Sequence, residues 1–122
     1  MRLIVALLLL TLTVPAWAEW LKYAEDKEVV FYYDPTTIKK TGNLRRVWEI
    51  EDLKKRPTDG ESSSHMMFEY DCKEQRYRGL SFRTHSEPMA SGKIIFRHDK
   101  PSTWRDVVPN SGRATILQIV CK

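Results

Sequence analysis

Residues 65–72 (HMMFEYDC) and 75–84 (QRYRGLSFRT), separated only by Lys73-Glu74, decide the fold of this chain. Two segments with aromatic and apolar residues at alternate positions, joined by two residues, predict an antiparallel β-hairpin. With Cys72 opposite Gln75, the register pairs Asp71 with Arg76, Tyr70 with Tyr77, Glu69 with Arg78, Phe68 with Gly79 and Met67 with Leu80. One face then carries opposite-charge pairs and the other an aromatic pair, and both arrangements stabilise antiparallel sheets.

Further strands are predicted on both sides of this hairpin. The segments with β-branched and aromatic patterns are residues 20–24, 29–33 (VVFYY), 44–53 (LRRVWEIEDL) and 93–98 (KIIFRH). Turn-forming residues separate them, at 34–38, 41–43 and 88–92, and residues 54–64 form a polar loop. Within 44–53, Trp48 and Ile50 share one face, with Glu49 and Glu51 on the other.

The first eighteen residues have the features of a secretory signal peptide. A basic start at Arg2 precedes an apolar run, and residues 15–18 (PAWA) predict cleavage after Ala18. The apolar run is shorter than the roughly twenty residues that a spanning helix needs. No cysteine stands at the cleavage point to take a lipid, so we expect no lipid anchor. We expect an exported chain that also has no transmembrane anchor once the signal peptide is removed.

The two cysteines, Cys72 and Cys121, are predicted to form a disulfide, because an even count in an exported chain favours one. Residues 110–121 (NSGRATILQIVC) predict a helix with Asn110 or Ser111 as its N-cap. Its apolar stripe consists of Ala114, Leu117, Val120 and Cys121. Cys72 shares a face with Tyr70, Phe68 and Met66, so the helix should cover that face. The predicted fold is α+β: a single antiparallel sheet of about five to six strands with a disulfide-tethered C-terminal helix.

Charge is unevenly distributed along the mature chain. Residues 19–71 hold nine Lys/Arg and twelve Asp/Glu, a net of −3, whereas residues 72–122 hold ten and four, a net of +6. A basic half favours acidic partners, although a mixed charged surface also keeps a small protein soluble. The basic candidates for partner binding are Arg76, Arg78, Arg83, Lys93, Arg97 and Arg105. Leu80 and Phe82, expected on the face opposite the helix, are apolar candidates for a partner or dimer surface.

No residue pattern announces catalysis. Ser and Thr lie outside any nucleophile motif, and both Cys are assigned to the disulfide. The carboxylate pairs Glu49 with Glu51 and Glu69 with Asp71 are interpreted as a solvated face neutralised by Arg76 and Arg78, with a calcium or acid–base site as the alternative. The histidines, His65, His85 and His98, lack metal-ligand spacing and are weak candidates for haem or a metal. Nucleic-acid binding is not expected.

Several motifs together resemble the surface-adhesin protein E-like domain of exported Gram-negative bacterial proteins. They are A-E-W (18–20), Y-x-D-P-x-T-I (32–38), G-N-x-x-R-V-W (42–48), Y-D-C-K-E-x-R-Y-R (70–78), Trp104 and the closing I-V-C (119–121). The resemblance spans residues 19–122 and implies the same sheet and tethered helix. The family's named member is an adhesin that binds host extracellular-matrix proteins, forms dimers and has been linked to haem.

The sequence and this resemblance together predict a non-enzymatic, exported binding module that engages an extracellular-matrix protein or another acidic partner, with a homodimer as a further expectation. The alternatives are a periplasmic small-ligand protein, with haem as its leading ligand, and an envelope assembly factor. The expected location is the periplasm, or the outer surface or medium.

Overall fold

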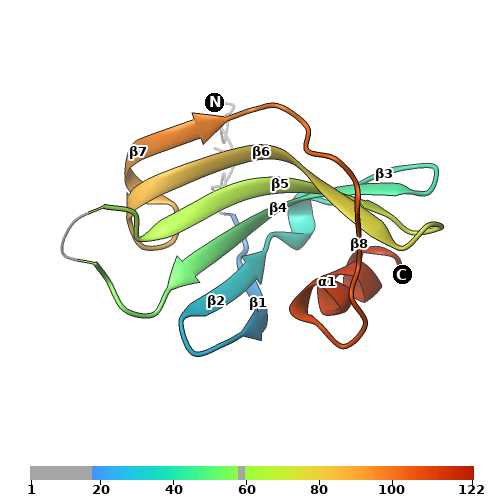
Figure 1. Cartoon of the computed structure of the whole chain (residues 1–122), viewed down its shortest axis with the longest axis horizontal. Helices are drawn as coiled ribbons and strands as arrows, with labels where there is room; N and C mark the ends of the chain where they lie inside the picture. Colours follow the sequence, from blue (N-terminus) through green and yellow to red (C-terminus); the bar gives the residue numbers. More distant parts are fainter. Residues whose placement is uncertain (1–17, 58–59) are drawn as a thin grey trace, which may run out of the picture.

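The computed structural model describes residues 18–57 and 60–122, so the predicted signal peptide lies outside the described residues except for Ala18. Figure 1 shows a curved sheet with one helix against its lower part. The elements are β1 (Leu21–Glu25), β2 (Val29–Tyr33), the 3-10 helix η1 (Pro35–Thr37), β3 (Lys39–Thr41), β4 (Leu44–Leu53), β5 (Ser63–Asp71), β6 (Arg76–Glu87), β7 (Ser91–His98), β8 (Arg105–Asp106) and α1 (Gly112–Val120).

The sheet is antiparallel and contains eight strands among the described residues. Six of them follow the order β1-β2-β4-β5-β6-β7, and the short strands β3 and β8 pair with β4 and β6. The predicted α+β architecture is confirmed, with a slightly higher strand count. The additional short elements lie where turns or irregular chain were expected. One of them is the 3-10 helix η1, whose N-cap Asp34 accepts a hydrogen bond from the Thr36 amide at 2.9 Å.

The register of the β5–β6 hairpin is confirmed for its first four pairs, from Asp71–Arg76 to Phe68–Gly79. The fifth is wrong, because Met67 lies opposite Ser81 and Leu80 is the extra residue of a β-bulge. Beyond the bulge Phe82 pairs with Met66. One extra residue moves the following side chains to the other face, so Phe82 lies on the helix-bearing side, not opposite it as expected.

We call the side of the sheet that packs against α1 the inner face, and the opposite side the outer face. The core on the inner face is formed by Val47 and Tyr70 from the sheet and by Ile116, Leu117 and Val120 from the helix. Ser111 is the N-cap, and its hydroxyl accepts a hydrogen bond from the Ala114 amide at 3.1 Å. The predicted stripe is correct for Leu117 and Val120 but omitted Ile116, which is completely buried.

The β4 strand corrects a second expectation. Glu49 was expected on a solvated face, but its side chain lies on the inner face, because it lies two residues from the core residue Val47 on β4 and pairs with the buried Met66. Only 1% of Glu49 is exposed. Ile50 is buried on the outer face instead. Alternation along β4 was predicted correctly, but which of its two faces meets the helix was not.

The disulfide Cys72–Cys121 is present and joins the end of β5 to the end of α1. Nearby, the buried Arg45 donates a hydrogen bond through Nε to the carbonyl oxygen of Val120 at 3.1 Å. The C-terminal end of the helix is therefore attached to the sheet by the disulfide, which the sequence predicted, and by the hydrogen bond from the charged Arg45, which it did not.

Replacing both Cys72 and Cys121 with serine should lower the free energy of unfolding by about 4 kcal/mol, because the disulfide closes a loop with a sequence separation of 49 residues. Urea unfolding of the mature chain and of the double variant, followed by circular dichroism, measures this difference. A loss of less than about 1 kcal/mol would contradict the assigned stabilising role.

Candidate binding groove

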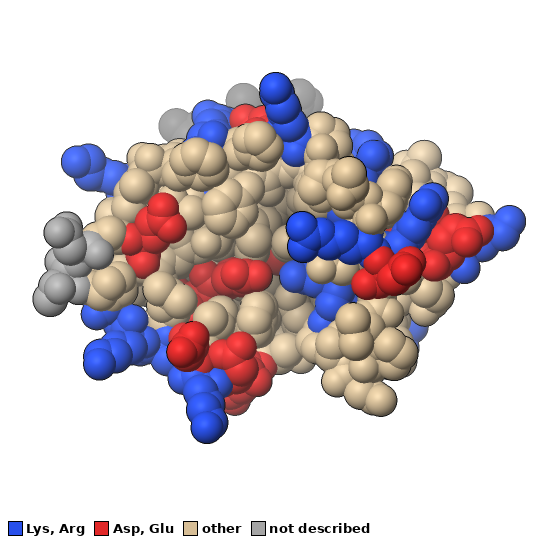
Figure 2. All heavy atoms as spheres, in the orientation of Figure 1, with Lys and Arg blue, Asp and Glu red and all other residues tan. Residues whose placement is uncertain are grey.

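The helix covers only one end of the inner face, and a groove remains open beside it. Two hollows, of about 420 and 400 Å³, share Tyr77 and Arg113 as lining residues. We call them together the inner groove. The first is lined by Tyr23, Ala24, Glu25, Asp26, Phe31, Asp106, Val108, Ser111 and Gly112, and the second by Glu51, Met66, Phe68, Gly79, Phe82, Ser102 and Arg105. Figure 2 shows acidic atoms within a hollow at the middle of the face in view.

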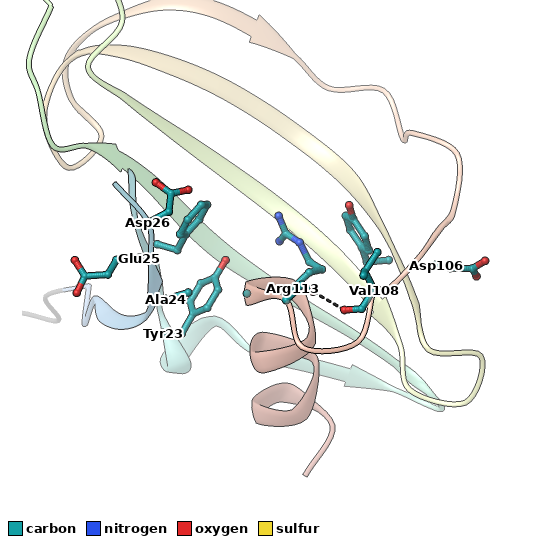
Figure 3. Close-up of a pocket in the computed structure, with 11 residues that line it drawn as sticks. Tyr23, Ala24, Glu25, Asp26, Asp106, Val108 and Arg113 are labelled. Carbon is teal, nitrogen blue, oxygen red and sulfur yellow. Dashed lines mark hydrogen bonds between the residues drawn. The ribbon is translucent and has the colours of Figure 1, made fainter. Parts of the chain in front are cut away.

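Arg113, from the first turn of α1, lies where the two hollows meet. Figure 3 shows its side chain directed from the helix toward the space that Tyr23 enters from β1. Its Nη1 donates to Glu49 Oε1 at 3.2 Å and to the Tyr70 hydroxyl at 2.9 Å. The guanidinium carbon lies 4.3 Å from the ring centre of Phe68, close enough for a cation–π interaction. A single side chain thus connects the helix to the sheet and to the groove.

Glu49 accepts three hydrogen bonds in this network, which we call the Glu49 network. Besides Arg113, the hydroxyl groups of Tyr23 and Tyr70 each donate to one of its carboxylate oxygens, both at 2.5 Å. Burial raises the pKa of Glu49, and the charge of Arg113 opposes that rise. Burial also raises the pKa of Tyr70 well above its usual range, so the phenol remains neutral and acts as a donor.

Glu51 lies one step further along the inner face and differs sharply from Glu49. Its side chain is half-buried, and burial raises its pKa. Among the described residues its carboxylate has neither a hydrogen-bond nor an ion-pair partner. A carboxylate held in a partly apolar groove without a partner is available to a ligand.

The charge pairs predicted across the hairpin are confirmed on the outer face. Arg78 lies 2.7 Å from Glu69, and Arg76 lies 3.1 Å from Asp71. The side chain of Trp104 lies beneath both guanidinium groups, with ring-centre distances of 4.6 Å to Arg76 and 4.5 Å to Arg78. Glu69 is completely buried under these contacts, so it is not the solvated carboxylate that the sequence indicated.

The remaining basic candidates do not gather in one patch. Arg97 pairs with Asp99 at 3.0 Å, and Arg83 lies over the ring of Trp48. Lys93 is exposed on β7, and Arg105 lines the inner groove from β8. Of the apolar candidates, Phe82 lines the groove and Leu80 occupies the bulge.

The three histidines lie on two faces. His65 and His85 lie on the outer face, with ring centres 6.4 Å apart, and Trp48 lies 4.3 Å from His65. His98 instead lies on the inner face of the edge strand β7, two residues after Phe96, and lines a hollow of about 120 Å³. The described residues contain no group of three or more His, Cys, Asp or Glu placed to hold a metal ion.

Comparison with known proteins agrees with this arrangement. The family model for surface-adhesin protein E matches residues 20–122. The chain belongs to the surface-adhesin protein E family. Comparison with curated protein sequences gave no match.

Solved structures of Haemophilus influenzae protein E share the fold of this surface-adhesin protein E family member. Crystal form II of that protein has a TM-score of 0.63 at 13% identity, covering 87% of this chain and 96% of the other. Protein E from non-typeable Haemophilus influenzae has a TM-score of 0.59 at 14% identity, covering 89% and 79%. Family membership makes the chain an adhesin-like binding module of the exported or surface class, with a protein as the expected kind of partner. In the part of the chain described, no helix has the length and apolar character to cross a membrane.

Sequence reasoning named three residues that line the inner groove, Glu51, Phe82 and Arg105, but missed Arg113, Tyr23 and Tyr77. Arg113 interrupts an apolar helix at its first turn, and that position signals a charged residue with a buried partner. Glu49 offers a similar signal, since it lies two residues from the core residue Val47 on the same face of β4. Tyr23 and Tyr77 had no distinguishing pattern, because aromatic residues are common in strands.

Replacing Arg113 with methionine should lower the free energy of unfolding by about 3 to 5 kcal/mol, because Glu49 then remains buried without its counter-charge. The double variant Arg113→Met/Glu49→Gln should lose less than the sum of the two single losses, by about 0.5 to 3 kcal/mol. Chemical denaturation of all four proteins measures this coupling. Strictly additive losses would show that the two side chains do not interact.

His65 should make stability fall in mild acid. Burial, with His85 and Arg83 adding to it, lowers the pKa of His65 from 6.5 to about 4. The unfolded chain therefore binds more protons than the folded chain between these values, and the folded state loses stability as pH falls from 6.5 to 4. As pH falls from 6.5 to 4, the free energy of unfolding of the wild type should fall relative to that of the His65→Gln variant. A difference between the two proteins that does not change with pH would contradict the prediction, and a proton NMR titration of the imidazole gives its pKa directly.

Proposed function

We propose that the mature chain, residues 19–122, is exported and binds an extracellular-matrix protein or another acidic protein without catalysing a reaction, with the inner groove as its contact surface. The observation that supports this is the open groove itself. Its floor carries half-buried apolar side chains from several strands, among them Phe31, Phe68 and Phe82, which α1 leaves uncovered. Concave surfaces with an apolar floor and a few polar groups are typical binding sites.

The groove is held in shape before any partner arrives. The Glu49 network fixes one side of it, and the disulfide fixes the far end of α1. A pre-formed surface loses little conformational entropy when it binds, so more of the contact energy appears as affinity. A rigid groove of this kind suits a segment of another protein.

Attraction to an acidic partner would come from the basic side chains that the fold leaves available. Arg76, Arg78 and Arg97 are in ion pairs. Arg105, in the groove, Lys93, on β7, and Arg83, which lies over the Trp48 ring on the outer face, have no ion-pair partner among the described residues. We therefore assign the acidic-partner contact to Arg105 first and to Lys93 second.

The small-ligand and envelope-assembly alternatives have no comparable support. None of the three histidines lines the inner groove: His65 and His85 lie on the outer face, and His98 lines the separate hollow of about 120 Å³. No feature of the described surface distinguishes an assembly factor.

Groove variants should lose partner binding. The mature chain is tested by biolayer interferometry against immobilised extracellular-matrix proteins, alongside Phe82→Ala and Arg105→Glu. We expect each variant to bind about tenfold more weakly, because one loses an apolar contact and the other reverses a charge in the groove. Lys73→Glu, an exposed charge change in the β5–β6 turn, is the matched control and should bind as the wild type does. Unchanged binding by both groove variants would contradict the assignment of the groove.

A further inference from the structure

One row of side chains across the inner face contains three polar groups that the fold leaves without partners. The strand registers place Phe31 opposite Glu51, Glu51 opposite Ser64, Ser64 opposite Thr84, and Thr84 opposite Phe96. Glu51, Ser64 and Thr84 therefore lie side by side on neighbouring strands, with an aromatic residue at each end of the row.

Each polar group in this row has unused hydrogen-bonding capacity. Thr84 is 1% exposed, and its hydroxyl has no hydrogen-bond partner. Neither the Ser64 hydroxyl nor the Glu51 carboxylate has a partner among the described side chains and backbone. Native proteins pair nearly all their buried polar groups, since an unpaired one costs free energy. Thr84 is such a buried group, and the half-buried Ser64 and Glu51 lie beside it in the same row without partners of their own, which indicates a missing partner.

The chemistry of the row favours a cation. The carboxylate of Glu51 supplies a negative charge, and the hydroxyls supply further acceptors. Phe31 flanks Glu51 in the row, and Phe82 lines the adjacent part of the groove. These aromatic rings could form cation–π interactions with a cation bound at Glu51. Arg113, which lines the same hollow as Glu51, is already hydrogen-bonded to Glu49 and Tyr70 and makes no ion pair with Glu51.

We propose that Glu51, Ser64 and Thr84 form a site for the basic side chain, lysine or arginine, of a partner protein segment that lies in the inner groove. The proposal rests on the groove being the contact surface. It also indicates which partner segments the groove prefers, because Arg105 lines the same groove and favours an acidic residue of the partner. The preferred segment then carries an acidic and a basic residue, one for each charge of the groove.

Capped peptides Ac-Val-Xaa-Val-NH₂, with lysine, arginine, norleucine or glutamate at Xaa, test the site by NMR titration of the ¹⁵N-labelled mature chain. We expect the lysine or the arginine peptide to shift the amide resonances of residues 51, 64 and 84, and to bind at least about tenfold more tightly than the norleucine and glutamate peptides. Glu51→Gln should reduce this affinity to the norleucine level. Thr84→Val, which removes only the hydroxyl, should weaken it by about threefold.

Glu28→Gln is the matched control, since Glu28 is exposed in the β1–β2 turn and away from the row. It should bind the basic peptides as the wild type does. The proposal is overturned if Glu51→Gln binds them unchanged, or if the shifts fall outside the row. Partner binding that is lost in Phe82→Ala but kept in Glu51→Gln would overturn this site alone. Peptide binding at Glu51 with no loss of partner binding in any groove variant would overturn the proposed function alone.

Discussion

The contact between Arg113 and Glu49 determines how the helix lies on the sheet. Glu49 is buried in the inner face, where a carboxylate is stable only with hydrogen-bond donors and a counter-charge around it. Tyr23, Tyr70 and Arg113 provide them from three different elements, β1, β5 and α1. The beginning of the helix is therefore tied to both the edge and the centre of the sheet.

The open groove follows from this placement together with the disulfide. One end of α1 is held by the Glu49 network and the other by Cys121, so the nine-residue helix covers only the part of the inner face around Val47 and Tyr70. The core is small: beyond these two residues, the described buried apolar side chains are Ile50, Met66, Ile116, Leu117 and Val120. A chain with so little apolar burial depends more than a larger domain does on covalent and polar connections.

The sequence predicted the local pairing well and the packing of faces less well. Opposite charges at Glu69–Arg78 and Asp71–Arg76 identified the hairpin register, because cross-strand pairs depend on neighbouring positions only. The bulge at Leu80 carries no such local signal, and missing it placed Phe82 on the wrong face. Glu49 was assigned to solvent because a glutamate in an alternating strand usually faces water. Its burial depends on Arg113, 64 residues away, and on two tyrosines that alternation does not single out. The strands could therefore be predicted from local sequence patterns, but the site could not, because it depends on contacts between distant residues.

The side-chain NMR spectrum of Arg113 tests the central claim most directly. In the oxidised mature chain at neutral pH, ¹⁵N-edited spectra should resolve separate, slowly exchanging Nη protons for Arg113, with nuclear Overhauser contacts to the rings of Phe68 and Tyr77. Those contacts follow from the 4.3 and 4.7 Å distances between its guanidinium carbon and the two ring centres. A single motionally averaged guanidinium signal, like that of an exposed arginine and without ring contacts, would contradict the account.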